Sequence, residues 1–379
     1  MHLSDRHRAV LRSVRALGPV SRKDLHEQLN LRPNTVGELV DDLLRDGLLR
    51  EGEPAPSGRG RPLVPLSIDR DQRSVAGIAV QVDSIQMTRM DLLGQRLGQS
   101  RTWRHSRRSN LHNDLVRAIA AANEIPGLAA VGVSIPGLID TARGRVVVSS
   151  ANARAASIDW PELAALTPAP MVLDNDMHAV AAQWLLQDRI DAAEDTLLVH
   201  LNDASVGSVL LIDGRPNHGC ILGGNELGHT RYDEDTDVCF CGQAGCLERI
   251  FSTAFLHRHG DNRQLLDVAA LPEAAPDDPS AAGPSPIHRV RHHLAMGLSN
   301  SINFIRPHRV HLISPLATCT LFRNALENQL KSLILAGLAD HVTIDWSPPP
   351  ANEFAHAAGW LAMTTLYFDH WSRGYVANL

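Results

Sequence analysis

Three cysteines fall within eight residues of one another, and this cluster constrains the fold of the chain more than any other feature. With a histidine ten residues upstream they give the pattern His-x9-Cys-x-Cys-x4-Cys, formed by His229, Cys239, Cys241 and Cys246. Three thiolates and one imidazole are the closed tetrahedral ligand set of structural zinc. We therefore predict a structural Zn²⁺ site with no open position for catalysis. The alternative is a cluster that binds no metal.

The composition indicates a packed protein. Its 379 residues are 44% hydrophobic and 21% charged, which favours two or three globular domains over disorder. No apolar run approaches the ~20 residues that span a bilayer, so we expect a cytoplasmic protein without membrane contact. The net charge is −6, but residues 1–70 carry +2 and the remainder −8. Contact with nucleic acid is therefore expected from the N-terminal part.

Residues 4–50 have the apolar spacing of helices separated by short turns. Ser4 and Ser21 are expected to be the N-caps of the first two helices, because a serine oxygen can accept from the free N–H groups of the first turn. A third helix follows Pro33 and ends by Gly47. Two short strands, near residues 48–50 and 63–68, flank a basic, glycine-rich stretch. This order predicts a winged helix-turn-helix over residues 1–70.

The expected DNA contacts lie at two places in this domain. The third helix offers Arg32, Asn34 and Thr35 at its N-terminal end, where a recognition helix meets the major groove. The wing offers Arg59 and Arg61 to the phosphate backbone or a narrow minor groove. We predict double-stranded operator DNA as the partner. The alternative is a small helical domain that binds another protein.

From residue 74 onward the pattern alternates between strands and helices, as in an α/β fold. Residues 270–287 are expected to form a surface loop. The predicted strands cover residues 75–82, 87–91, 129–134, 171–173, 197–201 and 208–212, and the predicted helices 111–122, 178–186, 293–305 and 351–371.

Four motifs carry a resemblance to a known family. They are residues 135–140 (Ile-Pro-Gly-Leu-Ile-Asp), Asn175-Asp176, residues 226–229 (Glu-Leu-Gly-His) and residues 239–248, which hold the cysteines and end in Glu248. With these motifs the chain resembles the ROK family (repressors, open reading frames and kinases), in its repressor branch with an N-terminal winged helix.

The resemblance implies a two-lobed, actin-like and sugar-kinase-like (ribonuclease H-like) α/β domain that binds a sugar between its lobes. Lobe 1 would span residues 74–190, completed by the C-terminal helix 351–379. Lobe 2, with the zinc site, would span residues 191–350. A homodimer or homotetramer is expected. The implied sugar contacts are Asn152, Asn175, Asp176, Glu226, His229 and Glu248.

The elements that would hold ATP phosphates in a family kinase are missing. A loop of the form Asp-x-Gly-Gly-Thr is expected at residues 79–83, which read Ala-Val-Gln-Val-Asp. The second loop, residues 202–208, keeps only Gly207, and Ile313-Ser314 stand where a glycine pair is usual. Phosphoryl transfer depends on positioning and charge stabilisation, so we predict no kinase activity and no catalytic residue.

We therefore interpret the chain as a sugar-responsive transcriptional regulator, a repressor of carbohydrate uptake or catabolism. Asp176, which would be the base of a family kinase, is then a ligand contact. Two alternatives stay open: an active ROK sugar kinase with an added DNA-binding domain, and a regulator controlled by a protein partner.

Overall fold

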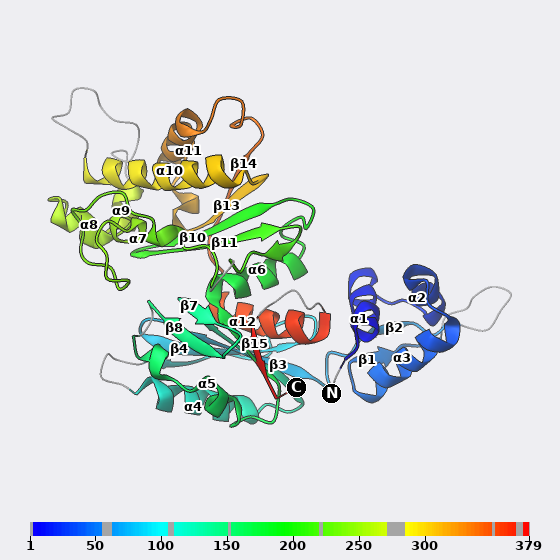
Figure 1. The fold of residues 1–379 in the computed structure, drawn as a ribbon. Coiled ribbons are helices and arrows are strands. Elements are labelled where there is room, and N and C mark those ends of the chain that lie inside the picture. Colours follow the sequence, from blue (N-terminus) through cyan, green and yellow to red (C-terminus); the bar gives the residue numbers. More distant parts are fainter. Residues whose placement is uncertain are drawn as a thin grey trace. The chain divides into compact units, whose positions relative to one another are not determined.

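The computed structural model describes residues 3–54, 63–104, 110–150, 153–219, 223–270, 285–350, 353–368 and 374–378. The chain divides into two compact units (Figure 1). The first comprises Met1–Leu186 with Asn352–Leu379, and the second Gln187–Ala351. Among the described residues, no helix is both long and apolar enough to cross a membrane.

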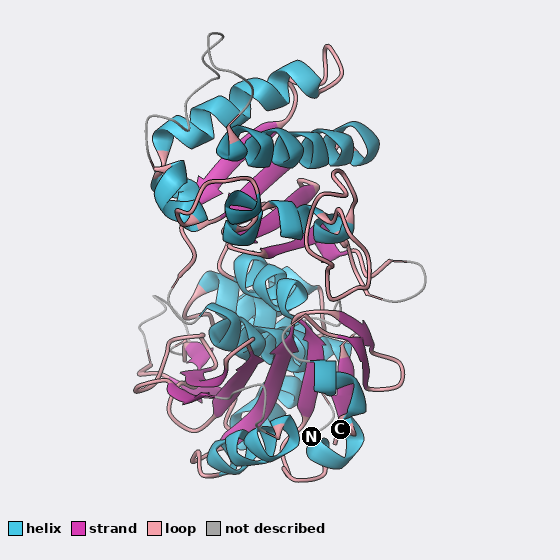
Figure 2. Cartoon of the chain, turned by 90° about the vertical axis from the view of Figure 1, so that its left-hand side faces the viewer, coloured by secondary structure: helices cyan, strands magenta, loops and turns pink. Residues whose placement is uncertain are grey.

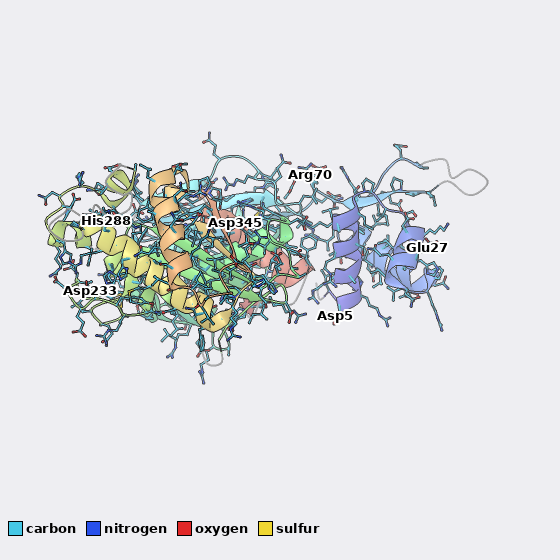
Figure 3. All side chains as sticks on the ribbon, turned by 90° about the horizontal axis from the view of Figure 1, so that it is seen from above. Asp5, Glu27, Arg70, Asp233, His288 and Asp345 are labelled. Atoms are coloured by element: carbon cyan, nitrogen blue, oxygen red, sulfur yellow. The ribbon has the colours of Figure 1, made fainter. Side chains whose placement is uncertain are left out.

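The first unit begins with three helices and a two-stranded ribbon. These elements are α1 (Asp5–Leu17), α2 (Arg22–Leu29), α3 (Pro33–Arg45), β1 (Leu49–Glu51) and β2 (Leu66–Ile68). Figure 3 shows Asp5 at the start of α1 and Glu27 on the neighbouring α2. Ser4 accepts from the N–H of His7 and Ser21 from that of Asp24, which confirms both predicted N-caps. The ribbon is antiparallel.

Arginines of α1 bind helix carbonyls elsewhere in the same unit. Arg8 donates from Nε to the Leu366 carbonyl at 3.2 Å, and Arg12 donates to the Phe368 carbonyl at 2.7 Å. Both carbonyls belong to the last turn of the helix that ends at Phe368. Because the last carbonyls of a helix have no partner within it, α1 supplies donors to that helix end.

The main sheet of the first unit has the strand order β15-β9-β6-β3-β4-β5. β3, β6 and β9 are parallel, whereas β3, β4 and β5 form an antiparallel meander. The strands are β3 (Ser74–Val80), β4 (Ser84–Asp91), β5 (Arg101–Arg104), β6 (Leu128–Ile135), β9 (Met171–Asn175) and β15 (Tyr375–Ala377).

Helices cover both faces of this sheet, so that every residue of β3 is buried. On one face lie α4 (Leu111–Asn123) and α5 (Trp160–Ala164), whose apolar residues share a core with the strands. On the other face lie α12 (Glu353–Met363) and α6 (Asp176–Leu186). Figure 2 shows the sheets with helices against them.

Two glycines let α12 approach the sheet closely. A Cβ at Gly77 would lie 1.9 Å from the Ala355 carbonyl oxygen, and one at Gly132 would lie 1.8 Å from that of Ala358. Both obstacles are backbone atoms. Any side chain at either position would therefore push α12 away from β3 and β6.

The second unit repeats the same sheet topology, with the strand order β12-β11-β10-β13-β14. Again a three-stranded antiparallel meander (β10, β11, β12) is followed by parallel strands (β13, β14). Apolar residues of β10 and β13 pack with those of α10 and α11. The elements are β10 (Thr196–Asn202), β11 (Ser205–Ile212), β12 (Arg215–Pro216), α10 (Pro286–Ile305), β13 (Arg309–Ile313), α11 (Thr320–Leu333) and β14 (Thr343–Ser347). The predicted α/β class is confirmed.

Several predicted boundaries were wrong. The strand expected over 171–173 continues to Asn175, and the helix expected from 178 starts at Asp176. The helix expected from 293 starts at Pro286, because proline is well suited to the first turn. The loop expected over 270–287 is therefore shorter at its C-terminal end, and its residues 271–284 lie outside the described chain.

The C-terminal helix also differs from its predicted span of 351–371. The α-helix ends at Met363 and continues as a π-helical turn, η5 (Thr364–Phe368). The hydroxyls of Thr364 and Thr365 donate to the carbonyls of Trp360 and Leu361. Such bonds to the preceding turn compete with regular helix geometry. Residues 369–373 lie outside the described chain.

Candidate functional site

The four predicted metal ligands come together in the second unit, on a loop that folds back on itself. His229 ends the short helix η2 (Leu227–His229), and Cys246 directly precedes α7 (Leu247–Ile250). The backbone of Tyr232 donates to Gly245 at 2.9 Å, and that of Leu247 donates to Thr230 at 2.9 Å. These bonds close the loop and bring its two ends side by side.

The ligand atoms lie close enough together to bind one metal ion. All four lie within 4.8 Å of one another. The Cys239 Sγ lies 3.6 Å from the His229 Nδ1, and the sulfurs of Cys241 and Cys246 are 3.5 Å apart. Zinc–sulfur bonds of ~2.3 Å and zinc–nitrogen bonds of ~2.0 Å place neighbouring ligands about 3.5–3.8 Å apart. The residues present therefore fit a divalent metal ion.

Burial disfavours charge on several of these groups. It raises the pKa of Cys246 to about 11 and raises the pKa of Cys239 as well. Burial also lowers the pKa of His229 below its usual value. Buried thiols are therefore protonated at neutral pH until a cation displaces their protons. A neutral imidazole is the form that binds a metal.

Two carboxylates lie beside the metal ligands. The buried Glu248 accepts from the Cys239 Sγ at 3.2 Å, and burial raises the pKa of Glu248. Glu226 is exposed, and its Oε2 lies 3.8 Å from the His229 Nε2. The two nitrogens of His229 thus face different partners. The histidine could bind a metal through Nδ1 and leave Nε2 towards Glu226 and a ligand, which allows both predicted roles.

The turn that carries Glu226 and His229 packs tightly against β11. A Cβ at Gly228 would lie 2.3 Å from the Val206 carbonyl oxygen. Asn225 accepts through Oδ1 from the N–H of Leu210 at 2.8 Å. Both contacts fix the turn to the sheet. The sequence analysis had no role for Asn225, because this bond joins it to another strand.

Two further predicted sugar contacts lie in the first unit, where β9 meets α6. Asn175 is the last residue of β9 and Asp176 the first of α6. The Asn175 amide donates to the Gly137 carbonyl at 2.9 Å, and its oxygen accepts from the N–H of Met177 at 2.8 Å. Asn175 is therefore held in a fixed position. It keeps one amide hydrogen and one lone pair for other partners.

A buried aspartate–histidine pair next to these residues was not predicted from the sequence. The His178 Nδ1 lies 2.9 Å from the Asp174 Oδ1, and both side chains are buried. The same carboxylate accepts from the N–H of Asn175 at 2.7 Å. It therefore supports the end of β9. The spacing of four residues between Asp174 and His178 was the only available signal.

The predicted DNA contacts fall partly within the described chain. Arg32 is the N-cap residue of α3, and both Arg32 and Asn34 are exposed. Thr35 is half-buried and lines a groove between α1 and α3. The predicted wing residues Arg59 and Arg61 lie outside the described residues, as does the predicted sugar contact Asn152.

Comparison with known proteins identifies the family. The model of the ROK family matches residues 75–366, which is most of the chain. The chain belongs to the ROK family. One ROK relative is the DNA-binding transcriptional repressor Mlc of Escherichia coli (strain K12), 25% identical over 384 residues that cover 95% of this chain and 93% of Mlc. Another is the xylose repressor of Bacillus subtilis (strain 168), 22% identical over 95% of this chain and 94% of that repressor.

Solved structures of the ROK family share the fold of this chain. A ROK family transcriptional regulator, a homologue of the E. coli Mlc protein, matches with a TM-score of 0.74 and 20% identity over 96% of both chains. A ROK glucokinase from Streptomyces griseus, in complex with glucose and AMPPNP, matches with a TM-score of 0.58 and 20% identity over 76% of this chain and 99% of its own. Together with the relatives, these matches support the repressor interpretation over the kinase alternative.

Proposed function

We propose that this ROK protein is a sugar-responsive transcriptional repressor that binds operator DNA through residues 1–70, as a winged helix-turn-helix. The extent of the matches carries this proposal. Mlc and the solved ROK regulator match 95% and 96% of the chain, whereas the glucokinase matches 76%. The ROK family model matches from residue 75 onward and so leaves the N-terminal helices and ribbon outside it.

The N-terminal elements support the DNA-binding role. α2 and α3 are joined by a short turn with Asn30 in the left-handed conformation, and a ribbon follows them. This is the element order of a winged helix-turn-helix, with α3 as recognition helix. Arg32, Asn34 and Thr35 would contact the major groove, and Arg59 and Arg61 the backbone or minor groove. We expect a cytoplasmic homodimer or homotetramer, because a two-fold protein matches a palindromic operator.

Asn175, Asp176, Glu226, His229 and Glu248 would contact the sugar, because they offer oxygens and nitrogens that pair with hydroxyl groups. Their neighbours hold several of them in place, as a specific site requires. Asn152 would complete the set. The names of the xylose repressor and of the E. coli N-acetylglucosamine repressor also favour a sugar effector.

Zinc would hold the loop between η2 and α7. His229, Cys239, Cys241 and Cys246 would bind it, and a closed set of four protein ligands gives zinc a structural role. The ion would supply a crosslink that fixes Glu226 and Glu248 beside the ligand. It would leave no position for a substrate atom.

In a family kinase, the corresponding loops hold the ATP phosphates. In this chain, side chains of these loops form hydrogen bonds within the protein instead, which supports the absence of phosphoryl transfer. Asp203, in the turn between β10 and β11, accepts from the N–H of Thr253 at 2.7 Å and from its hydroxyl at 2.6 Å. It thereby stabilises the start of α8 (Thr253–Arg258). The Ser314 hydroxyl accepts from the N–H of Leu316 at 3.2 Å. An anionic side chain in the first of these turns would also repel phosphates.

A thermal-shift screen of the zinc-loaded protein tests the sugar site. Its wells would contain glucose, xylose, N-acetylglucosamine, several oligosaccharides and magnesium-ATP. At a hundred times the dissociation constant a ligand adds about 2.7 kcal/mol of stability, which raises the melting temperature by several degrees. We expect one sugar to give this shift and magnesium-ATP to give none.

Matched variants show whether the shift comes from the predicted site. Glu248→Gln should abolish it, because the buried carboxylate is removed. Glu234→Gln, at an exposed acid that pairs with Arg231, should retain it. A thermal shift with magnesium-ATP would contradict the proposed loss of nucleotide binding. The absence of a shift with any of the sugars would favour control by a protein partner.

A further inference from the structure

One side of α3 is exposed. The opposite side is buried through Val36, Leu39, Val40 and Leu43. The exposed side carries Asn34, Glu38, Asp41 and Arg45, at intervals of three or four residues. If α3 is the recognition helix, as the proposed function requires, this is the side that enters the major groove.

The acidic residues of α3 differ in their partners. Asp41 accepts from Arg22 at 2.8 Å. Asp42 accepts from Arg45 at 2.8 Å, and its other oxygen lies 3.5 Å from the His7 Nε2. Glu38 has neither a hydrogen bond nor an ion pair with any residue that the structure describes. It is thus the one acid of this helix whose charge no described residue offsets.

An uncompensated carboxylate on this side has a consequence for DNA binding. Phosphates repel it, so it weakens binding to any sequence in which it meets no donor. The major groove presents hydrogen-bond donors only at the amino groups of cytosine N4 and adenine N6. A carboxylate typically accepts from cytosine N4, whereas adenine is read by an amide that donates and accepts at once. Glu38 is therefore suited to select cytosine.

Gly37, the neighbouring residue, supports a close approach of DNA. Glycine is unfavourable inside a helix, and the space where its Cβ would lie contains no atom within 4 Å. Packing within the described chain thus gives no reason for glycine. An open backbone beside Glu38 lets a partner come close to α3.

We propose that Glu38 accepts a hydrogen bond from the N4 amino group of a cytosine in the operator, and that Gly37 gives the DNA room to approach. The separation of Asn34 and Glu38 along α3 indicates where this base lies in the operator. Glu38 lies four residues after Asn34, which is about 6 Å along the helix at ~1.5 Å per residue. Base pairs are ~3.4 Å apart. The cytosine therefore lies within about two base pairs of the base that Asn34 contacts.

Selection from a library of random DNA duplexes tests this inference with the full-length protein. The wild type should enrich a motif that contains the cytosine, and duplexes with another base at that position should bind on the order of tenfold more weakly. Glu38→Ala should enrich a motif in which that position is degenerate. Glu38→Gln, which keeps the length of the side chain, should bind the substituted duplexes more tightly than the wild type does.

The control is Glu27→Gln on α2, which removes the same charge from an exposed acid that lies 3.7 Å from Lys23 (Figure 3). It should keep the wild-type motif, cytosine included. The same base preference in wild type and Glu38→Ala would overturn the inference and leave the proposed function intact. Failure of the wild type to enrich any motif would instead contradict the proposed function, and the inference with it.

Discussion

The turn that carries Glu226 and His229 is positioned by its contact with β11, and Gly228→Ala tests this directly. The new Cβ would lie 2.3 Å from the Val206 carbonyl oxygen, whereas ordinary contacts begin at 3.4 Å. Because the obstacle is backbone, the turn must move by about 1 Å. Metal sites tolerate errors of about 0.2 Å in ligand distances, and ligand sites about 0.5 Å.

We therefore expect Gly228→Ala to lose zinc affinity by at least tenfold and to lose the thermal shift with the effector sugar. Overpacking of this kind costs about 1–3 kcal/mol of stability. The assays are zinc content after dialysis against a chelator of known affinity, and the thermal shift with the effector. The control is Gly260→Ala in the same unit, where glycine, unlike Gly228, has a positive φ of 90° and nothing lies within 4 Å of the Cβ. It should lose some stability and keep its zinc. Full zinc occupancy and an unchanged sugar response in Gly228→Ala would refute the reasoning.

Three further predictions follow from contacts described above. Asp203→Ala should lower the free energy of unfolding by about 1 kcal/mol, measured by denaturant titration, because the N–H and hydroxyl of Thr253 at the start of α8 lose their acceptor. Asp203→Asn should restore most of this stability, and magnesium-ATP binding by either variant would show that only charge blocks a nucleotide site. Gly37→Ala should raise the free energy of unfolding by about 1 kcal/mol and weaken operator binding; unchanged affinity would show that the open backbone is not used. Cys246→Ser should lose zinc and several degrees of melting temperature, whereas Cys319→Ser, outside the cluster, should keep its zinc; equal zinc content in both variants would contradict the assigned ligands.

Local features were predictable from the sequence. Ser4 and Ser21 act on residues three positions away, so their capping is visible in a short segment. The strand pair β10–β11 follows from two short apolar runs, residues 197–201 and 208–212, on either side of a short polar stretch. The cluster of possible metal ligands could be predicted because three of its four residues fall within eight residues of the chain and only a few ions accept that set.

Features that depend on distant contacts could not be predicted. The glycines at 77 and 132 are needed because α12, more than two hundred residues later in the chain, crosses β3 and β6 there. Asp203 accepts from Thr253, which lies fifty residues later in the chain, so this hydrogen bond could not be predicted. The π-helical turn at Thr364–Phe368 was not predicted from the sequence.

The central claim is that the protein couples sugar binding to operator binding without phosphorylating the sugar. Fluorescence anisotropy with a labelled duplex, taken from the selection experiment, measures this coupling directly. The dissociation constant for the duplex should change severalfold when the effector sugar is added and should not change with magnesium-ATP. The duplex should bind with the same affinity whether or not ATP accompanies the sugar. ATP-dependent consumption of the sugar, or an operator affinity that no sugar changes, would contradict the account.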